Sequence, residues 1–155
     1  MTATDDTSGV RFPPPLIYVG GFVIGYLLDR AVPLRLTSRS LGEPLGWALV
    51  AMGVVLMGSA VVTFRRAGTS LNPARPTTTV VVHGPYRLTR NPMYLGWVIA
   101  YLGCVLLTNT VWPLVSLPIV LVLISRAVIA KEERYLDAKF GDAYRAYKAR
   151  VRRWL

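Results

Sequence analysis

The chain contains four long apolar runs, and these constrain its fold more than any other feature. The run at residues 45–64 carries no charged side chain, and three others cover residues 15–28, 92–107 and 111–130. A helix needs about 20 mostly apolar residues to cross the hydrocarbon core of a bilayer. The pattern therefore predicts an all-α membrane protein with four transmembrane helices.

Small residues and prolines indicate how two of these helices are built and joined. Gly21 and Gly25 are four positions apart in the first run, a spacing that lets two membrane helices pack closely. Pro113 and Pro118 are expected to set the start of the fourth helix and a kink within it. The short uncharged sequence at residues 108–110 predicts a tight turn between the third and fourth helices.

Charge is distributed unevenly along the chain and predicts its orientation. The 155 residues, taken as a single domain, include 18 Lys and Arg against 8 Asp and Glu, for a net charge of +10. The positive-inside rule places the basic linker at residues 65–91 and the basic tail at residues 131–155 in the cytoplasm, with both termini. Residues 1–14 are expected to form a flexible N-terminal segment.

The basic residues border apolar runs, which indicates the kind of partner they meet. Anionic lipid headgroups attract basic side chains close to a membrane, so membrane lipids rather than nucleic acid are the expected partner. We expect the protein in the bacterial inner membrane, with no obligate protein partner.

The tail has the pattern of an amphipathic helix. Residues suited to one helix face recur at every third or fourth position, while the other face carries Lys, Arg and Asp. This pattern predicts a C-terminal amphipathic cytoplasmic helix that is broken at Gly141. The recurring residues are Glu133, Leu136, Phe140, Tyr144, Tyr147, Val151 and Trp154.

The segment HGPYRLTRNPMYLG, residues 83–96, places polar groups directly before the third apolar run. Gly84 and Pro85 indicate a turn, and Pro92 suits the first turn of a helix. That helix start would present free backbone N–H groups and a positive dipole end beside Arg90, a combination that binds anions. An ordinary basic linker with a helix cap is the alternative. The sequence before this segment predicts a short strand at residues 79–82.

Two adjacent acids, Glu132 and Glu133, lie at the cytoplasmic end of the fourth run. Carboxylates at that position oppose both the helix dipole and the positive charge bias, and a local cost of this kind often marks a site. The pair could hold the ammonium or hydroxyl groups of a ligand. Salt bridges to Arg90, Arg126 or Lys131 are the alternative.

Several familiar motifs are absent from the sequence. No GxGxxG motif, P-loop, CxxC or HExxH motif occurs, which argues against a Rossmann-type nucleotide site. The chain has one cysteine, Cys104, and one histidine, His83, so a zinc site built from these ligands is not expected and no metal is expected. His83 could contact a ligand or serve as a structural turn residue.

The motifs occur together and in a fixed order. HGPYRLTRNPMYLG, a charge-free helical hairpin and EERYLDAKFGDAYRAYKARVRRWL resemble the isoprenylcysteine carboxyl methyltransferase family, and the related phospholipid N-methyltransferases share the pattern. The resemblance covers about residues 64–154. It implies an integral membrane methyltransferase that uses S-adenosyl-L-methionine and releases S-adenosyl-L-homocysteine. The implied acceptor is lipophilic or isoprenoid-like, carries a carboxylate or an amine, and is methylated at the cytoplasmic membrane face.

The resemblance also implies residue roles. Arg90 and Arg150 are expected to hold the substrate carboxylate as catalytic residues, and Tyr147 is expected to contact the substrate. Many family members have Arg-His-Pro where this chain has Arg90-Asn91-Pro92, so any role for a titrating histidine would be missing here. The residues expected to bind the cofactor are His83, Gly84, Pro85, Tyr86, Asn91, Pro92, Tyr94, Leu95, Gly96, Glu132 and Glu133.

Two other functions fit the sequence less well. A membrane reductase with a nicotinamide cofactor has a similar C-terminal pocket, but such proteins are much longer. The hypothesis of a non-enzymatic scaffold that binds lipid through its basic tail does not explain the adjacent acids Glu132 and Glu133. The methyltransferase hypothesis requires that the basic linker, the paired acids and the tail enclose one cavity, which must contain Tyr94, Glu133 and Tyr147.

Overall fold

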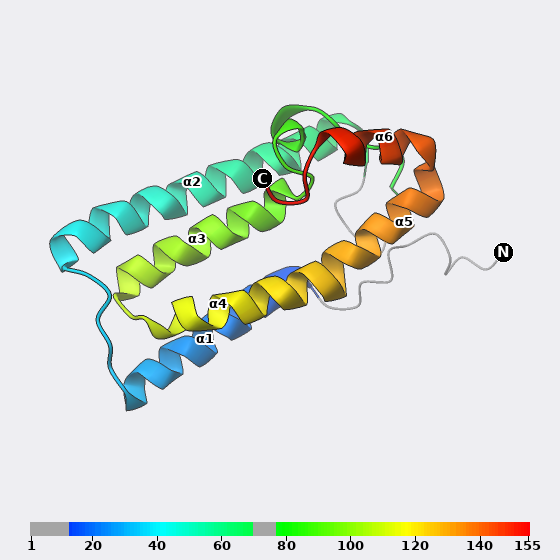
Figure 1. The fold of residues 1–155 in the computed structure, drawn as a ribbon. Helices are drawn as coiled ribbons and strands as arrows, with labels where there is room; N and C mark the ends of the chain where they lie inside the picture. The colour runs from blue at the N-terminus through cyan, green and yellow to red at the C-terminus, as the bar shows by residue number, and fades with distance from the viewer. Residues whose placement is uncertain (1–12, 70–76) are drawn as a thin grey trace.

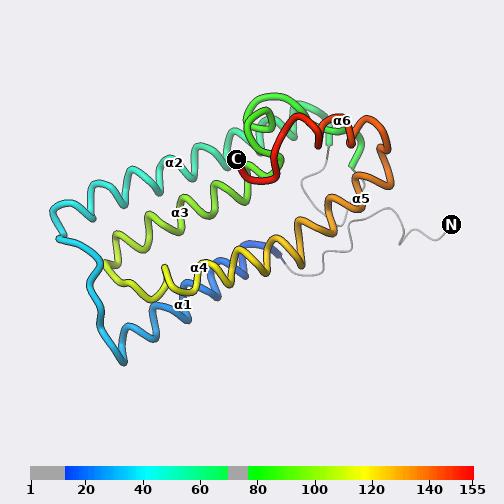
Figure 2. The backbone as a smooth tube through the Cα atoms, in the orientation of Figure 1, coloured from blue at the N-terminus to red at the C-terminus, as the bar shows by residue number. Residues whose placement is uncertain are grey.

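The computed structural model describes residues 13–69 and 77–155, and these parts of the chain are helical with no β-strand (Figure 1). The predicted all-α fold is confirmed, while nearly all of the N-terminal segment predicted to be flexible, residues 1–14, lies outside the described residues. Four long helices run antiparallel along the molecule (Figure 2). They are α1 (Pro14–Ala31), α2 (Arg39–Arg66), α3 (Pro92–Thr108) and α4 (Trp112–Leu123).

Shorter elements gather at one end of the bundle. A single 3₁₀ turn, η1 (Gly84–Arg87), precedes α3, and a π-helical segment, η2 (Ile124–Ile129), joins α4 to α5 (Ala130–Phe140). The chain then folds back into α6 (Asp142–Arg150), which packs against α5 (Figure 1).

The first and fourth helices pack closely at the two glycines that predicted such a contact. A Cβ atom on Gly25 would lie 2.5 Å from the backbone nitrogen of Pro113, and one on Gly21 would lie 2.2 Å from Cγ2 of Val120. Neither position leaves room for a side chain, so the close packing predicted for Gly21 and Gly25 is confirmed.

The most extensive helix contact joins α2 to α3, and it was not predicted. A Cβ atom on Gly53 would lie 2.6 Å from the carbonyl oxygen of Gly96, and one on Gly103 would lie 2.7 Å from the carbonyl oxygen of Gly46. Backbone meets backbone at both points, as small residues permit in membrane helix pairs. This contact fixes the start of α3, which carries part of the candidate site.

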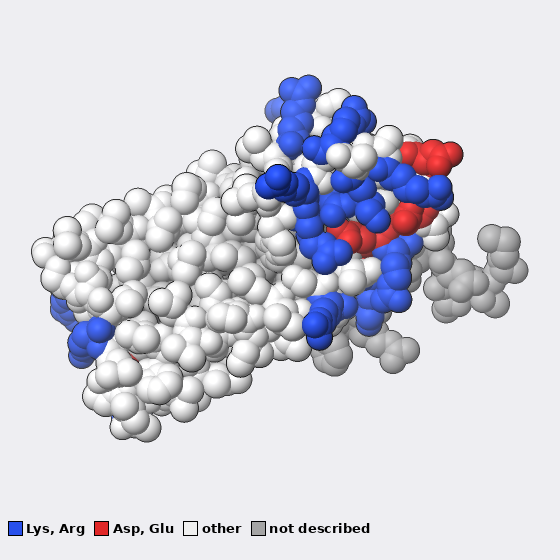
Figure 3. Space-filling view, in the orientation of Figure 1, with Lys and Arg blue, Asp and Glu red and all other residues white. Residues whose placement is uncertain are grey.

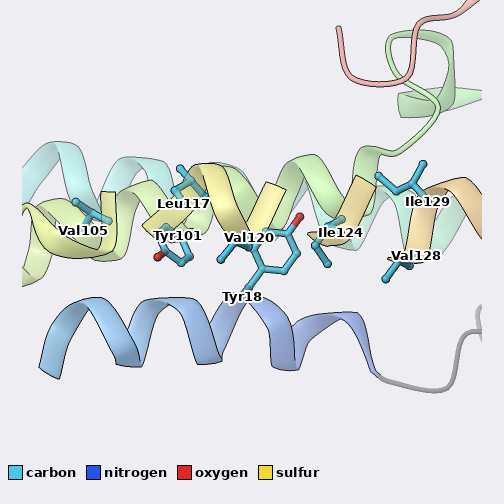
Figure 4. Close-up of a cluster of buried hydrophobic side chains, with 8 residues drawn as sticks. All are labelled: Tyr18, Tyr101, Val105, Leu117, Val120, Ile124, Val128 and Ile129. Carbon is cyan, nitrogen blue, oxygen red and sulfur yellow. The ribbon is translucent and has the colours of Figure 1, made fainter. Parts of the chain in front are cut away.

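The apolar core lies between α1, α3 and α4 (Figure 4). Two buried tyrosines find polar partners within it, as buried hydroxyl groups require. The Tyr18 hydroxyl donates to the carbonyl oxygen of Tyr94 at 3.2 Å, and the Tyr101 hydroxyl donates to that of Pro113 at 2.8 Å. The buried members of this core are Tyr18, Tyr101, Val105, Leu117, Val120, Ile124, Val128 and Ile129.

Two helical stretches are long and apolar enough to cross a membrane, namely Arg39–Arg66 and Trp112–Phe140. Only 17% and 33% of their most apolar windows are buried within the protein, so most of their apolar side chains face outward. A buried core helix of a soluble protein would show the opposite. The helix α3 is apolar but shorter, with 17 residues. The count of four transmembrane helices stays a prediction.

The turn predicted at residues 108–110 is organised by one side chain. Asn109 adopts a left-handed conformation, with φ at 49°, and ends α3. Its amide oxygen accepts hydrogen bonds from the backbone nitrogens of Leu36 and Thr37, both at 3.0 Å. The α1–α2 and α3–α4 connections are thereby tied together at one end of the bundle.

The opposite end carries most of the charge. Figure 3 shows Lys, Arg, Asp and Glu gathered around α5 and α6, while the middle of this face is free of charge. The arrangement matches the clustering of basic residues in the linker and the tail of the sequence.

The linker and tail depart from prediction at two points. The strand predicted at residues 79–82 is wrong: the segment is irregular, and the nearby backbone nitrogen of Thr77 pairs with the Tyr135 hydroxyl instead of a second strand. The break at Gly141 is confirmed, with φ at 51°. The helix ends at Arg150, so Val151 and Trp154 lie beyond it.

Candidate active site

A cavity of about 300 Å³ lies at the charged end of the bundle, where the start of α3 meets α5 and α6. The start of α1 and the linker before η1 complete its walls. Its lining includes Tyr94, Glu133 and Tyr147, the three residues that were predicted to share one cavity. The other lining residues are Pro14, Pro15, Phe64, Thr77, Thr79, Val80, Val81, Tyr86, Arg90, Asn91, Pro92, Met93, Trp97, Glu132, Tyr135, Leu136 and Tyr144.

A carboxylate between two arginines forms the most strongly charged part of the site. Glu133 is buried on α5, and its Oε1 forms an ion pair with Nη2 of Arg90 at 3.1 Å. Arg153 donates from Nε to the same oxygen at 3.1 Å and from Nη2 to Oε2. These hydrogen bonds to Glu133 raise the pKa of Arg153 above its ordinary value. Glu133 therefore holds two arginine side chains at one carboxylate.

The neighbouring acid has a different environment. The Tyr94 hydroxyl donates to Oε1 of Glu132 at 2.8 Å, and no ion pair with Glu132 is found among residues 13–69 and 77–155. Both side chains line the cavity. Glu132 thus retains acceptor capacity for a ligand.

Tyrosines from three elements form one wall. The Tyr147 hydroxyl on α6 donates to the carbonyl oxygen of Tyr86 at 2.7 Å, which ties α6 to η1. Burial raises the pKa of Tyr147 to about 12 and also raises the pKa of Tyr86 and Tyr144. All three hydroxyls are therefore neutral near pH 7.

Some buried donors in this wall have no protein partner within the described chain. They are the Tyr86 hydroxyl and the Nε and Nη1 atoms of Arg90. Leaving such groups unpaired costs free energy, and in native proteins they call for an explanation. Because both side chains line the cavity, they are suited to bind an oxygen-bearing or anionic group of a ligand.

The local sequence explains how η1 reaches the cavity. Gly84 has φ at 58°, a left-handed conformation, and Pro85 follows it in the 3₁₀ turn that carries Tyr86. A Cβ atom on Gly84 would lie 3.0 Å from Oγ1 of Thr63 on α2. Tyr86 then packs on Phe64 with ring centroids 5.1 Å apart.

Not every residue predicted for the site lines the cavity. The predicted residues that do line it are Tyr86, Arg90, Asn91, Pro92, Tyr94, Glu132, Glu133 and Tyr147. Those that lie outside the lining are His83, Gly84, Pro85, Leu95, Gly96 and Arg150.

Two of these residues show why a predicted site residue can lie outside the cavity lining. Gly96 faces α2, where a Cβ atom would lie 2.5 Å from Met57, so it serves helix packing. Arg150 is exposed and donates from Nε to the carbonyl oxygen of Ala146 on its own helix. The structure therefore places Arg150 away from the carboxylate-holding position predicted for it.

Sequence reasoning missed several residues of the site, of which the most important is Arg153, a partner of the cavity-lining Glu133. Arg153 lies three positions beyond Arg150, where the chain has left the helix, so helical spacing gave no signal for it. Trp97 and Met93, one turn apart on α3, were assigned to the apolar run alone. Their spacing from Tyr94 on the same helix could have indicated a shared wall.

No group of three or more metal-ligating side chains occurs within the described ranges. The cavity instead combines hydrogen-bond donors, a carboxylate with spare acceptor capacity and aromatic walls. An all-helical bundle with outward apolar faces and such a cavity at its charged end indicates a class: a helical protein suited to a membrane, with a candidate ligand site at one end of the bundle.

Comparison with known proteins identifies the family. The family model described as phospholipid methyltransferase matches residues 43–143, which covers most of α2 and the cavity-lining segments through α5. The chain therefore belongs to the phospholipid methyltransferase family, whose members are membrane methyltransferases.

Two relatives are similar over parts of the chain. An uncharacterized protein of Haemophilus influenzae is 41% identical over 63 residues, covering 41% of this chain and all of the relative. Methanethiol S-methyltransferase 1 of Bradyrhizobium diazoefficiens is 31% identical over 112 residues, covering 68% of this chain and 37% of the relative. No solved structure matches the chain.

Proposed function

We propose that this protein is an integral membrane methyltransferase that uses S-adenosyl-L-methionine to methylate a lipophilic acceptor at the cytoplasmic membrane face. The observation that carries the proposal is the cavity itself. It brings the unpaired donors of Tyr86 and Arg90 together with the carboxylate of Glu132, within a chain that belongs to a methyltransferase family. This combination favours a methyltransferase over a nicotinamide-dependent reductase or a lipid-binding scaffold.

The residues present fit the chemistry of this cofactor. Its ammonium and ribose hydroxyl groups need acceptors, which Glu132 supplies, and the rings of Tyr94 and Trp97 offer faces that attract a cation. The cavity volume of about 300 Å³ is at the lower end for small-molecule sites. S-adenosyl-L-methionine supplies an electrophilic methyl group when bound.

The chain's own task in the reaction is to align and shield. Methyl transfer is an in-line displacement, so fixing the acceptor atom against the methyl carbon gives much of the rate. Arg90 and Tyr86 would orient the acceptor through N–H and O–H donors. The apolar walls formed by Phe64, Met93 and Trp97 would exclude water from the reacting atoms.

The available donors favour an acceptor that bears oxygen. A carboxylate accepts hydrogen bonds from an arginine and attacks without losing a proton, whereas an amine must be neutral to attack. The family description names phospholipids and the relative's name indicates methanethiol, so amine and thiol acceptors are the alternatives. A thiol would also have to lose its proton before or during attack.

The apolar surface supports the location of the acceptor. With four crossings, the charged end would lie at the inner leaflet, where a soluble cofactor and a lipid-dissolved acceptor can both reach one cavity. Outward-facing apolar side chains on α1, α2 and α4 agree with this arrangement. The charge bias supports a cytoplasmic position of both termini, and the inner membrane is the location that we propose.

Calorimetric titration of the detergent-purified protein with S-adenosyl-L-methionine tests the proposal. We expect saturable binding and competition by S-adenosyl-L-homocysteine. We also expect Arg90→Gln to lower turnover more than cofactor affinity, because Arg90 is assigned to the acceptor. Folded protein that binds neither compound, but binds a nicotinamide nucleotide or only anionic lipid, would overturn the proposal.

A further inference from the structure

The last five residues, 151–155, form a C-terminal strap that is fixed to the turn before α3. The carbonyl oxygen of Arg152 accepts a hydrogen bond from the backbone nitrogen of Arg90 at 3.0 Å. The carbonyl oxygen of Arg153 accepts two more, from Oγ1 of Thr89 at 3.0 Å and Nδ2 of Asn91 at 2.9 Å. These three hydrogen bonds hold the strap through its backbone carbonyl oxygens.

This attachment brings one side chain to the carboxylate of Glu133, which lines the cavity. Arg153 contacts both oxygens of Glu133, donating from Nε to Oε1 and from Nη2 to Oε2. Arg90 reaches the same carboxylate through Nη2 alone. Its Nε and Nη1 atoms are buried without a protein partner in the described chain.

We infer that Arg153 is a positioning residue for the proposed methyl transfer: it occupies the Glu133 carboxylate so that Arg90 keeps two donors free for the acceptor. The inference rests on the proposed function and assigns it a residue that neither the motifs nor the family description indicated.

The physical reason is the preference of guanidinium groups for paired contacts with a carboxylate. Without Arg153, Oε2 of Glu133 would be left buried and without its partner. Arg90 is the other cation on this carboxylate, and a bidentate contact would satisfy both oxygens. That contact would turn the Nε or Nη1 donor of Arg90 toward Glu133 and away from the acceptor.

The test is the substitution Arg153→Gln, which removes the charge but keeps the backbone carbonyl that anchors the strap. We expect kcat/KM for the methyl acceptor to fall at least tenfold, while the affinity for the cofactor changes less than threefold. The matched control is Arg152→Gln, because the Arg152 side chain is exposed and only its carbonyl oxygen is used. We expect the control to stay within twofold of the wild type.

Arg153→Lys provides a second variant should the glutamine variant fail to fold. A lysine keeps the charge and can hold one oxygen of Glu133, so we expect activity between those of the wild type and Arg153→Gln. Wild-type activity in either folded Arg153 variant, or an equal loss in Arg152→Gln, would overturn the inference.

A double-mutant cycle separates positioning from a merely structural role. If Arg153 acts through Glu133, then Arg153→Gln should cost little further activity in a Glu133→Gln background. Additive losses would overturn the inference. Failure of the proposed function looks different, because in that case the wild-type protein itself would neither bind S-adenosyl-L-methionine nor methylate an acceptor.

Discussion

At the scale of single residues, the adjacent acids of α5 have separate tasks. Glu133 forms ion pairs with Arg90 and Arg153 and positions both side chains. Glu132 receives one hydrogen bond, from Tyr94, and lines the cavity. The alternative of salt bridging, left open by the sequence, therefore applies to Glu133 but not to Glu132 within the described residues.

The division leads to a prediction for Glu132→Gln. Burial raises the pKa of Glu132 above its ordinary value, and the ammonium group of a bound cofactor would favour its charged form. The variant lacks that charge, and hydrogen bonds to charged groups contribute about 1.5–3 kcal/mol, so we expect the Kd for S-adenosyl-L-methionine to rise by about tenfold or more. Thermal stability should not fall, because glutamine can still accept from Tyr94 and burying a neutral group costs less than burying a charge. Calorimetry and thermal unfolding measure the two effects.

The matched control is Tyr94→Phe, which removes the hydrogen bond to Glu132 and leaves its charge. We expect a smaller loss of affinity than in Glu132→Gln. An unchanged Kd in the glutamine variant would remove Glu132 from the ligand site.

At the scale of helices, the contact between α2 and α3 depends on the absence of side chains. We expect Gly53→Ala to destabilise the protein by about 1–3 kcal/mol, because the new methyl group would meet backbone atoms that cannot move aside. The nearest is the carbonyl oxygen of Gly96, at 2.6 Å. Thermal unfolding in one detergent, followed by tryptophan fluorescence, measures the loss.

The same helix supplies the control. Gly58 on α2 has no atom within 4 Å of the position its Cβ would take. Gly58→Ala should therefore leave the stability unchanged or raise it slightly, since alanine is the better helix former by about 0.5–1 kcal/mol. Equal destabilisation by both substitutions would show that helix propensity or lipid contact, rather than the α2–α3 contact, sets the effect.

The sequence predicted the helices well because their signals are local. Apolar composition, Gly141 and the short turn at residues 108–110 each act within a few positions, and the structure confirms them. Contacts between distant segments gave no such signal. The segment at residues 79–82 lacks a partner strand among the described residues. The π-helical segment η2 (Ile124–Ile129) contains no proline or glycine from which it could be predicted.

The site was predictable to the extent that it lies on regular elements. Tyr94 and Glu132 occupy helices whose faces the sequence outlines, and both line the cavity. The contact between Arg153 and Glu133 has a backbone cause. Val151 adopts an extended conformation, with φ at −123° and ψ at 129°, and this turns the following residues toward Glu133.

At the scale of the whole molecule, the two ends of the bundle differ in charge and in task. One end ties its connections together through the Asn109 amide and carries no cavity residue. The other end gathers residues 77–81 of the linker, α5 and α6 around the cavity. Most of the charged side chains on the face shown in Figure 3 lie at this end. A four-span topology would place these ends on opposite sides of the membrane.

Cysteine labelling tests that topology. Replacing the single native cysteine, Cys104, by alanine gives a background into which one exposed or half-buried position at a time is changed to cysteine. We expect a membrane-impermeant maleimide to label the outer positions in intact cells and the inner positions only after permeabilisation. The outer positions are Ser38 and Val111, and the inner positions are Pro13, Arg87 and Ala138.

Each position tests a specific crossing. If a cysteine at Pro13 is protected from the maleimide in intact cells and one at Ser38 is labelled, α1 must cross the membrane. If a cysteine at Arg87 is also protected, α2 must cross it as well. Labelling of Val111 between the protected positions Arg87 and Ala138 requires that α3 and α4 form a spanning hairpin. If Val111 were labelled only after permeabilisation while Ser38 was labelled in intact cells, that hairpin would not span. The cavity would then open to the inner leaflet of a two-span protein, and the long α2 would be one of its two crossings.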